Sequence, residues 1–400
     1  MGYKEIKPDI YWVGAIDWDR RIFDELVSTP HGTSYNAYLI KDEKTVLIDT
    51  VEPYLKDILL TNIKDAGVEK LDYIISNHAE QDHSGTIPTL LQMFPDAKVI
   101  TNPKCKELLI EHLEIPEDKI ITVEDKETIS IGKRTLQFFY TPWVHWPETM
   151  STYIPEDDII FTCDLFGAHL ATSEIFSSDN WAEVEIEVKR YYAEIMMPFR
   201  MHIRRYIKLM KDLKVDMIAP SHGPVHNTVE QVLKTYEVWV SDTVKDMVII
   251  AYVSMHGSTY EAVRVLEREL LRRNVDVKVF NLTKTDPGEF AMALVDAATI
   301  VFATPTVLAS AHPSIIYFAH LVRALRPKAK NLAIINSYGW GGMTIKQIED
   351  ILGILKLNKL SYVSFKGKIK EKVINEIVNL ADEIEEATQQ TVKTCPETGC

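Results

Sequence analysis

The chain has 400 residues, of which 46% are hydrophobic and 26% are charged, so it is long enough for two or three globular domains. Its formal net charge is −14 at pH 7, which argues against a nucleic-acid partner and against binding to an anionic membrane surface. The sequence also lacks the roughly 18 consecutive apolar residues that a bilayer-spanning helix needs.

The first part of the chain predicts several strands and one helix. Runs rich in β-branched and aromatic residues cover 9–13, 35–40 and 45–49, and a helix is expected from about Tyr54 to Ala66. A further strand-like run at 71–77 ends directly before a cluster of histidines and carboxylates. A strand that ends in such a cluster is typical of a metal site.

The cluster is the segment His78–His83, with the sequence HAEQDH. Side chains two residues apart on a strand share a face, so His78 and Glu80 can bind one ion. Asp82 and His83 follow after the chain has begun to turn, so they can face a second ion. The alternative interpretation is a polar loop that caps the helix after Gly85.

This set of candidate ligands is completed by three residues that come much later in the chain. His145 follows Thr141 and Pro142, Asp164 ends the apolar run 159–163, and His222 ends the run 217–221. Each stands at the end of a predicted strand. Four imidazoles and three carboxylates suffice for two ions, with Asp164 as the bridge.

This pattern resembles the metallo-β-lactamase superfamily, whose usual first motif is HxHxDH. Glu80 replaces the second histidine of that motif and adds a negative charge. With Asp82, Asp164 and a bridging hydroxide, the ligands carry four negative charges, which would neutralise two ferrous ions. Zinc is redox-inert and suits histidine and cysteine, whereas carboxylates suit harder ions. The ligand set therefore favours a di-iron redox site over a dizinc hydrolase.

The intervening segments predict an αββα sandwich. A helix at about 87–93 leads into a strand near 97–101, and Gly132 separates the strands of a hairpin at 128–140. His145 follows that hairpin in the chain, and Asp164 follows the next hairpin. The metal loops are expected along one edge of the sandwich.

A helical pattern covers 181–213, with Pro198 expected to break or start a helix. Its aromatic and methionine residues, including Tyr191 and Tyr192, are interpreted as core. His169 is interpreted as a loop or core histidine rather than an eighth ligand.

The pattern changes after a helix at about 229–242. From residue 247 strands and helices alternate, with strands at 247–253, 275–280, 299–303, 332–336 and 360–364. Five strands with regular crossovers predict a doubly wound parallel sheet. We therefore place the domain boundary near residue 245, with one domain at 1–245 and the other at 246–400.

Three segments at the carboxyl ends of these strands predict a flavin site. The first can cradle a phosphate at a helix N-terminus and resembles the flavodoxin phosphate loop; it consists of Ser254, Met255, His256, Gly257, Ser258 and Thr259. The second is a loop that contains Pro305, Thr306, Val307 and Leu308. The third is a loop with Ser337, Tyr338, Gly339, Trp340 and Gly341. Ligands of open α/β sheets bind at such strand ends.

The two halves together resemble the flavodiiron proteins over nearly the whole chain. The motif H-x-E-x-D-H, the segments 35–38 and 145–147, and the loop 254–257 carry the resemblance. It implies reduction of O2 to water, of NO to N2O, or both, with FMN as cofactor. It also implies a head-to-tail homodimer, which can pair further into a dimer of dimers, and a separate electron donor such as rubredoxin or a reduced deazaflavin.

The resemblance also implies how the ligands are shared. One iron would be held by His78, Glu80 and His145, and the other by Asp82, His83 and His222, with Asp164 between them. Two ferrous ions and reduced FMN hold four electrons, the number that O2 needs to reach two waters. The sequence leaves the choice between O2 and NO open.

Two other functions fit parts of the sequence. In a metal-dependent hydrolase with an attached flavodoxin domain, the metals would activate water. In a non-catalytic electron carrier or O2 sensor, the di-iron site would only report the redox state. Metal and flavin content, and turnover with a reduced donor, discriminate among the three.

Cysteine usage and the N-terminus predict a cytoplasmic protein. Cys105 and Cys163 lie in apolar surroundings and are expected to be buried free thiols, whereas Cys395 and Cys400 lie in a polar tail. The first residues lack the apolar core of a signal peptide. A reducing compartment fits both observations.

Overall fold

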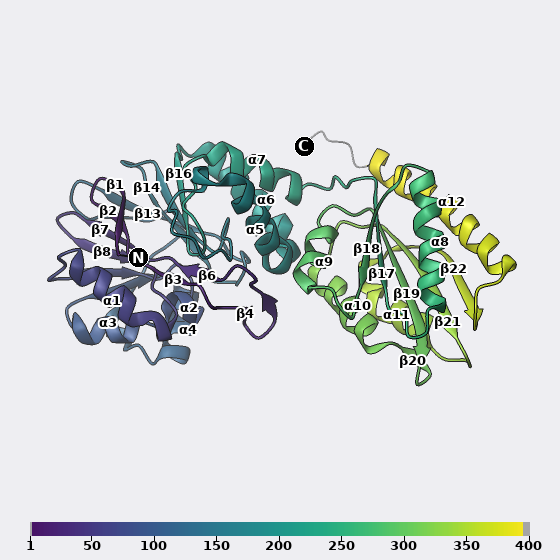
Figure 1. Cartoon of the computed structure of the whole chain (residues 1–400). Coiled ribbons are helices and arrows are strands. Elements are labelled where there is room, and N and C mark those ends of the chain that lie inside the picture. The colour runs from purple at the N-terminus through teal and green to yellow at the C-terminus, as the bar shows by residue number, and fades with distance from the viewer. Residues whose placement is uncertain (1, 395–400) are drawn as a thin grey trace. The chain divides into compact units, whose positions relative to one another are not determined.

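The structure is a computed structural model that describes residues 2–394, and it divides into two compact units (Figure 1). The first unit contains residues 2–192 and 199–237, and the second contains residues 193–198 and 238–394. Each unit has its own sheets and its own hydrophobic core.

The first sheet of the first unit has seven strands in the order β1-β2-β7-β8-β9-β10-β11. Strands β8 to β11 are parallel, and the pairs from β1 to β8 are antiparallel. The bounds are β1 Lys4–Lys7, β2 Ile10–Trp12, β7 Tyr38–Lys41, β8 Thr45–Ile48, β9 Tyr73–Ile75, β10 Lys98–Thr101 and β11 Ile120–Thr122.

The second sheet has five strands in chain order, β12 to β16. Its pairs are antiparallel except for β15 and β16, which run parallel. The bounds are β12 Thr128–Ser130, β13 Thr135–Tyr140, β14 Met150–Ile154, β15 Ile159–Cys163 and β16 Met217–Pro220. Two short hairpin-like pairs complete the unit: β3 Ala15–Asp17 with β6 Thr33–Tyr35, and β4 Ile22–Phe23 with β5 Val27–Ser28.

The core of this unit lies between its two sheets. Val46 and Ile48 enter it from β8, and Phe138 and Phe161 enter it from the second sheet. Val46 and Ile48 share a face because residues two apart on a strand point the same way. Burying each such side chain contributes about 1.5–3 kcal/mol to folding. The apolar alternation of these strands therefore sets which face of each sheet becomes the inner one.

Helices cover both outer faces of the sandwich (Figure 1). One layer is formed by α1 Lys56–Asp65, α2 Gln81–Ser84, α3 Ile87–Met93 and α4 Pro103–Leu113. The other is formed by α5 Trp181–Tyr191, α6 Arg200–Asp212 and α7 Val229–Val240. Residues 192–199 between α5 and α6 form a π-helical turn and a 3-10 turn, and Pro198 lies in the latter, as the sequence predicted.

The strand directions bring several loops to one end of the sandwich. Because β15 and β16 are parallel, their carboxyl ends meet at the same edge. The loop from β13 to β14 reaches that edge too, since β14 is antiparallel to both of its neighbours. Residues 141–149, 164 and 221–223 are thereby placed together.

The second unit is built on five parallel strands in the order β18-β17-β19-β21-β22. Their bounds are β17 Met247–Tyr252, β18 Asp276–Asn281, β19 Thr299–Val307, β21 Asn331–Tyr338 and β22 Asn358–Lys366. In chain order this is 2-1-3-4-5, a common doubly wound order whose direction switches between β17 and β19.

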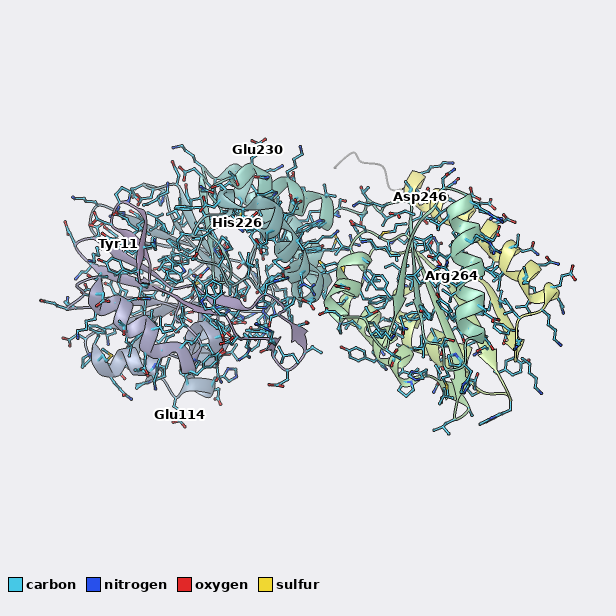
Figure 2. The ribbon with its side chains drawn as sticks, in the orientation of Figure 1. Tyr11, Glu114, His226, Glu230, Asp246 and Arg264 are labelled. Atoms are coloured by element: carbon cyan, nitrogen blue, oxygen red, sulfur yellow. The ribbon has the colours of Figure 1, made fainter. Side chains whose placement is uncertain are left out.

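Helices lie on both faces of this sheet (Figure 1). On one face are α8 Ser258–Arg272 and α12 Glu371–Thr394, which share a core with the strands. On the other are α9 Pro287–Leu294, α10 Pro313–Leu325 and α11 Thr344–Leu352. The outward side of α8 is charged: Arg264 points away from the sheet (Figure 2), and its Nη1 lies 2.6 Å from Glu267 Oε2.

Three local features differ from the sequence prediction. One is that Ser337 and Tyr338, predicted as part of a loop, are the last two residues of strand β21. Helix α4 was not predicted from the sequence, although Asn102 caps it by accepting a hydrogen bond from the Cys105 backbone N–H, and Pro103 opens its first turn. The prediction that 304–307 form a loop was wrong, because β19 continues through Val307 and pairs there with β20, Ser310–Ala311. The actual turn is Leu308–Ala309, whose φ angles are 49° and 61°.

Two other expectations concern cysteines and membranes. Cys105 and Cys163 are buried free thiols, as predicted, and Cys395 and Cys400 lie outside the described residues. Within residues 2–394, every helix is either too short or too polar to cross a membrane.

Candidate metal centre and cofactor-binding edge

The structure gathers all seven predicted metal ligands at one end of the first unit, in two neighbouring groups. Within each group the candidate ligand atoms lie within 4.8 Å of one another. One group consists of His78, Glu80, His145 and Asp164, and the other of Asp82, His83 and His222.

The HAEQDH segment bends between the two groups. The chain leaves β9 at Ile75, bends at Asn77 and again at Glu80, and then enters the short helix α2 that carries Asp82 and His83. The Thr50 backbone N–H donates to the His83 carbonyl at 2.7 Å and holds this helix against the sheet. The predicted turn after Glu80 is therefore one turn of helix, and it directs its side chains to the second group.

Asp164 lies between the groups and presents one oxygen to each. Its Oδ2 lies 3.5 Å from His78 Nε2 and 3.4 Å from His145 Nε2. Its Oδ1 lies 3.0 Å from His83 Nε2 and 3.4 Å from His222 Nε2. This is the geometry that a carboxylate bridging two cations requires.

Each group also has a carboxylate of its own. Glu80 Oε2 lies 3.0 Å from His78 Nε2 and 3.2 Å from His145 Nε2. Asp82 Oδ2 lies 3.2 Å from the Nε2 atoms of both imidazoles in the second group. The two groups thus offer similar sets of nitrogen and oxygen donors.

Several of these donors are buried without a hydrogen-bond partner among the described residues. They are both oxygens of Asp82, both ring nitrogens of His83 and Oδ2 of Asp164. Leaving a buried polar group unsatisfied costs about 1–3 kcal/mol, and folded proteins avoid it. Converging imidazole and carboxylate donors of this kind fit two metal cations, which would satisfy them.

Two histidines are held in the tautomer that a metal needs. The Nδ1–H of His78 donates to Glu148 Oε1 at 2.6 Å, and the Nδ1–H of His222 donates to the Ser34 carbonyl at 2.7 Å. When a ring loses its second proton to a metal, its lone pair lies on Nε2, the atom that faces the carboxylates. These outer partners orient the imidazoles before any ion binds.

The sequence analysis did not identify Glu148 as a functional residue. It is only 2% exposed, and although burial would raise its pKa, the hydrogen bond and charge of His78 outweigh burial and lower it. Glu148 therefore stays ionised beside His78. Its position three residues after His145 is the one signal in the sequence that could have indicated it.

The carboxylates also change the acidity of the imidazoles. Burial alone would lower the pKa of His145 and His222, but hydrogen bonds and charges of the surrounding carboxylates raise the pKa values to about 9 and about 10. The pKa of Asp164 falls well below its usual value because the charges of His83 and its other imidazole partners outweigh burial. A metal-free cluster is therefore an array of imidazolium and carboxylate ions.

We expect metal binding to release at least two protons per chain at pH 7.5, because His145 and His222 must lose the protons that their pKa values of about 9 and 10 retain, and because the carboxylates, against the effect of burial, also raise the pKa values of His78 and His83. The folded pKa values of His145 and His222 exceed the unfolded value of about 6.5. The stability that these protons contribute to the metal-free protein is thus complete below pH 6.5 and lost as pH rises towards 10.

Calorimetric titration of the metal-free protein with a divalent cation, in two buffers of different ionisation enthalpy, measures the number of protons released. Repeating it near pH 10.5 provides the control, since the imidazoles of His145 and His222 are then largely neutral and the release should shrink. A proton count near zero at pH 7.5 would contradict this description of the cluster.

Tyr191 and His169 are buried neighbours of the second ligand group, and their rings lie beside that of His222. Tyr191 is buried as predicted, and its hydroxyl also donates to Asp164 Oδ1 at 3.0 Å. The ring centroid of His169 lies 5.0 Å from that of His222, and its Nδ1 lies 2.9 Å from Thr33 Oγ1. Burial, with the nearby His222, lowers the pKa of His169 well below its usual value, so it stays neutral. His169 is buried, as predicted, and is a neighbour of the two groups rather than a member.

The two groups are open to solvent on one side only. The side chains of Glu80 and His145 are 16% and 17% exposed, whereas the other five are at most 3% exposed. Asp24, at the tip of the β4–β5 turn, faces this side. Burial and the charges of Glu80 and Asp82 raise its pKa to about 6. The sequence analysis missed Asp24 because it lies far from the ligands along the chain.

The predicted flavin segments meet at one edge of the second unit, at the carboxyl ends of β17, β19 and β21. Gly257 precedes α8 with a φ of +92°, and as a glycine it contributes no side chain to cap that helix N-terminus. The Ser254 hydroxyl accepts from the Tyr260 backbone N–H at 3.2 Å. The hydroxyls of Thr259 and Ser337 lie 2.7 Å apart and link the first segment to the third.

Hydrogen bonds from the Asn336 side chain also connect the region of the second flavin segment to that of the third. Asn336 Nδ2 donates to the Thr304 carbonyl at 3.2 Å and to Thr306 Oγ1 at 3.1 Å. Leu308 and Trp340 remain 86% and 64% exposed at the rim. A helix N-terminus preceded by a glycine, beside exposed apolar side chains, can bind a phosphate and a flat ring together.

Comparison with known proteins gives matches to the first unit alone and to nearly the whole chain. A family model described as "ODP family beta lactamase" matches residues 33–223. A nitric oxide reductase of Moorella thermoacetica is 35% identical over 364 residues, which cover 89% of this chain and 91% of that protein. An anaerobic nitric oxide reductase flavorubredoxin of Vibrio vulnificus is 33% identical, over 86% of this chain and 71% of that protein.

Two solved structures are similar over almost the whole length. The rubredoxin oxygen:oxidoreductase of Desulfovibrio gigas matches with a TM-score of 0.94 and 27% identity, over 98% of this chain and 99% of that one. The flavodiiron protein of Giardia intestinalis matches with a TM-score of 0.92 and 26% identity, over 98% of each chain.

Proposed function

Because the chain belongs to the flavodiiron protein family, we propose that it reduces O2 to water, NO to N2O, or both, at a di-iron centre supplied with electrons by FMN. The observation that carries this proposal is Asp164, whose two oxygens face two separate groups of ligands. Relatives named as reductases and an oxidoreductase disfavour the alternative of a metal-dependent hydrolase.

We infer that the two ligand groups hold one iron each and share Asp164. The first iron would be bound by His78, Glu80 and His145, and the second by Asp82, His83 and His222. When bound, the irons and FMN supply the redox chemistry. The three carboxylates offset the charge of the cations, Glu148 and the Ser34 carbonyl orient two imidazoles, and Tyr191 donates a hydrogen bond to Asp164.

The second unit fits FMN. The backbone N–H groups that open α8 would hold the phosphate. Gly257 allows the chain to turn there with a φ of +92°, which L side chains rarely adopt, and no described atom lies within 4 Å of its Cβ position, which leaves space for a ligand. The segments 305–308 and 337–341 would flank the ring. We propose Ser254 to Thr259, Pro305 to Leu308 and Ser337 to Gly341 as the residues around FMN.

We propose that residues 1–245 form a metallo-β-lactamase-like αββα domain and residues 246–400 a flavodoxin-like domain. The two-sheet sandwich, its match to a β-lactamase family model and the strand order 2-1-3-4-5 support this division. The five-stranded parallel sheet fits the second assignment.

We further propose a head-to-tail homodimer, which can pair into a dimer of dimers, and a separate electron donor. The metal ligands and the flavin segments belong to different domains, and the family resemblance implies that a second subunit brings its flavin to the first subunit's metals. The name of the Desulfovibrio gigas protein identifies rubredoxin as that protein's partner. We propose a rubredoxin, or alternatively a reduced deazaflavin, as the donor here.

Metal and flavin analysis of anaerobically purified protein, followed by paired O2 and NO consumption assays with a reduced donor, tests the function. We expect about two irons and one FMN per chain and consumption of at least one of the two gases. Fully active protein that contains only zinc would contradict the di-iron proposal. Iron- and FMN-replete protein without turnover would instead indicate a carrier or sensor.

A further inference from the structure

The segment that carries His222 is held by the side chain of one buried asparagine from elsewhere in the chain. This segment, residues 220–223, begins at the last residue of β16, and Asn36 directly follows β6 and is 1% exposed. The Asn36 Nδ2 donates to the Pro220 carbonyl at 2.8 Å and to the Gly223 carbonyl at 2.7 Å. The amide therefore contacts both ends of the segment that presents His222 to the metal site.

The Asn36 amide uses all of its hydrogen-bonding positions. Its Oδ1 accepts from the Trp12 indole N–H at 2.7 Å and from the Ser34 hydroxyl at 3.1 Å. An asparagine amide has two N–H donors and two acceptor lone pairs, so four bonds satisfy it completely. An indole nitrogen can only donate and a peptide carbonyl can only accept, so these partners determine which way the amide points. A buried polar network that is fully satisfied is rigid.

Ser34 connects this support to the imidazole of His222. The Ser34 carbonyl accepts from the His222 Nδ1–H at 2.7 Å, and the Ser34 hydroxyl, which donates to Asn36, also accepts from the Gly223 backbone N–H at 2.8 Å. The Asn36 backbone N–H donates to the Ser221 carbonyl at 2.7 Å. Residues 34–36 thus fix both the ring of His222 and the main chain on either side of it.

We propose that Asn36 is a positioning residue for the second ligand group, which acts through the segment 220–223 to direct His222 Nε2 towards the bound cation. This inference rests on the proposed function, since it needs a metal in that group. His222 Nε2 lies 3.2 Å from Asp82 Oδ2, and distances between a metal and its ligands are fixed to within about 0.2 Å. A small shift of the segment therefore weakens the site, although Asn36 itself is not one of the grouped ligands.

The test measures binding of Co²⁺ to the full-length, metal-free protein by calorimetry. Asn36→Ala is expected to weaken binding at one of the two sites about 10–100-fold, the usual effect of losing an outer-sphere partner, and to leave the other site unchanged. The matched control is Asn62→Ala. Asn62 is 3% exposed, and its Nδ2 also donates to two carbonyls, those of Val13 at 3.0 Å and Gly14 at 2.9 Å, which carry no candidate ligand. This control should keep both affinities.

Double variants separate positioning of His222 from a general loss of stability. In a His222→Ala background, Asn36→Ala should cause no further loss of Co²⁺ affinity, because the ring that it directs is absent. In a His78→Ala background, which affects the first ligand group, it should still weaken the second site by the full factor. Ser34→Ala is a milder change that keeps the Ser34 carbonyl, so it should weaken the same site less, and it serves if Asn36→Ala does not fold.

A second measurement uses the metal-free protein and is independent of the proposed function. Solvent exchange of the His222 Nδ1–H, followed by NMR of ¹⁵N-labelled protein, should be at least about tenfold faster in Asn36→Ala than in the wild type or in Asn62→Ala. The physical reason is that the hydrogen bond to the Ser34 carbonyl opens more often when its support is lost.

Four results would overturn the positioning role of Asn36: an unchanged exchange rate, an unchanged Co²⁺ affinity, equal effects of Asn62→Ala, or additive losses in the His222→Ala background. Failure of the wild type to bind two Co²⁺ ions would instead refute the two-metal centre of the proposed function. In that case the exchange rate of the His222 Nδ1–H still decides whether Asn36 holds the ring.

Discussion

Asp164→Ala is expected to leave less than one iron per chain and to abolish reduction of O2 and NO. Asp164 contributes one oxygen to each ligand group, so its loss removes a ligand from both sites and leaves four imidazoles with fewer compensating charges. Loss of an outer-sphere partner already lowers metal affinity about 10–100-fold, and loss of a shared ligand should exceed about 100-fold. Iron analysis after dialysis and gas-consumption assays measure both effects.

The neighbouring Cys163→Ala variant is the control for this experiment. Cys163 is buried next to Asp164, and its thiol lies within 4.8 Å of candidate ligand atoms of His83 and Asp164. Burial raises the pKa of this thiol well above its usual value, so it stays protonated and is a poor ligand. The variant should keep both irons. Equal loss of iron from the two variants would contradict the assignment of Asp164 as the bridge.

Mixing two inactive variants should restore about a quarter of wild-type turnover, because half of the randomly mixed dimers each contain one intact flavin–metal combination out of two. The first variant, Gly257→Val, should lose FMN, since a β-branched residue strongly disfavours a φ of +92° and would block the close approach of the backbone to the phosphate. The second, His78→Ala, should lose metal from the first ligand group.

Controls make this complementation specific. Gly353→Ala, in the same unit, adds a Cβ at a φ of −55° where no described atom lies within 4 Å, so it should keep FMN. Subunit exchange is verified with differently tagged chains. Exchange without recovery of activity would show that electrons do not pass between subunits, and would contradict the head-to-tail arrangement.

The fold elements that the sequence predicted best are those with strong local patterns. The strands at 247–253 and 299–303 are continuous apolar runs, and both are buried in a parallel sheet. The extension of β19 to Val307 was missed because it depends on pairing with β21 at Thr304 and Pro305 and with β20 at Thr306 and Val307, and a strand partner is not visible in the residues themselves. Helix α4 was missed even though its cap, Asn102, is a local signal.

For the site, the sequence by itself determined the candidate ligands. Histidine and carboxylate side chains stand after predicted strands. His78 and Glu80 do reach one ligand group, but β9 ends at Ile75, so the bent segment after the strand brings them together and strand spacing does not. Only the tertiary structure decided that Asp164 presents one oxygen to each group, that Glu148 orients His78 across 70 positions of the chain, and that Tyr191 reaches Asp164. These contacts join residues far apart in sequence, and they form only when the two sheets pack face to face and bring their loops to one edge. Ligand type is a property of single residues, whereas the partner of each ligand is a property of the packed chain.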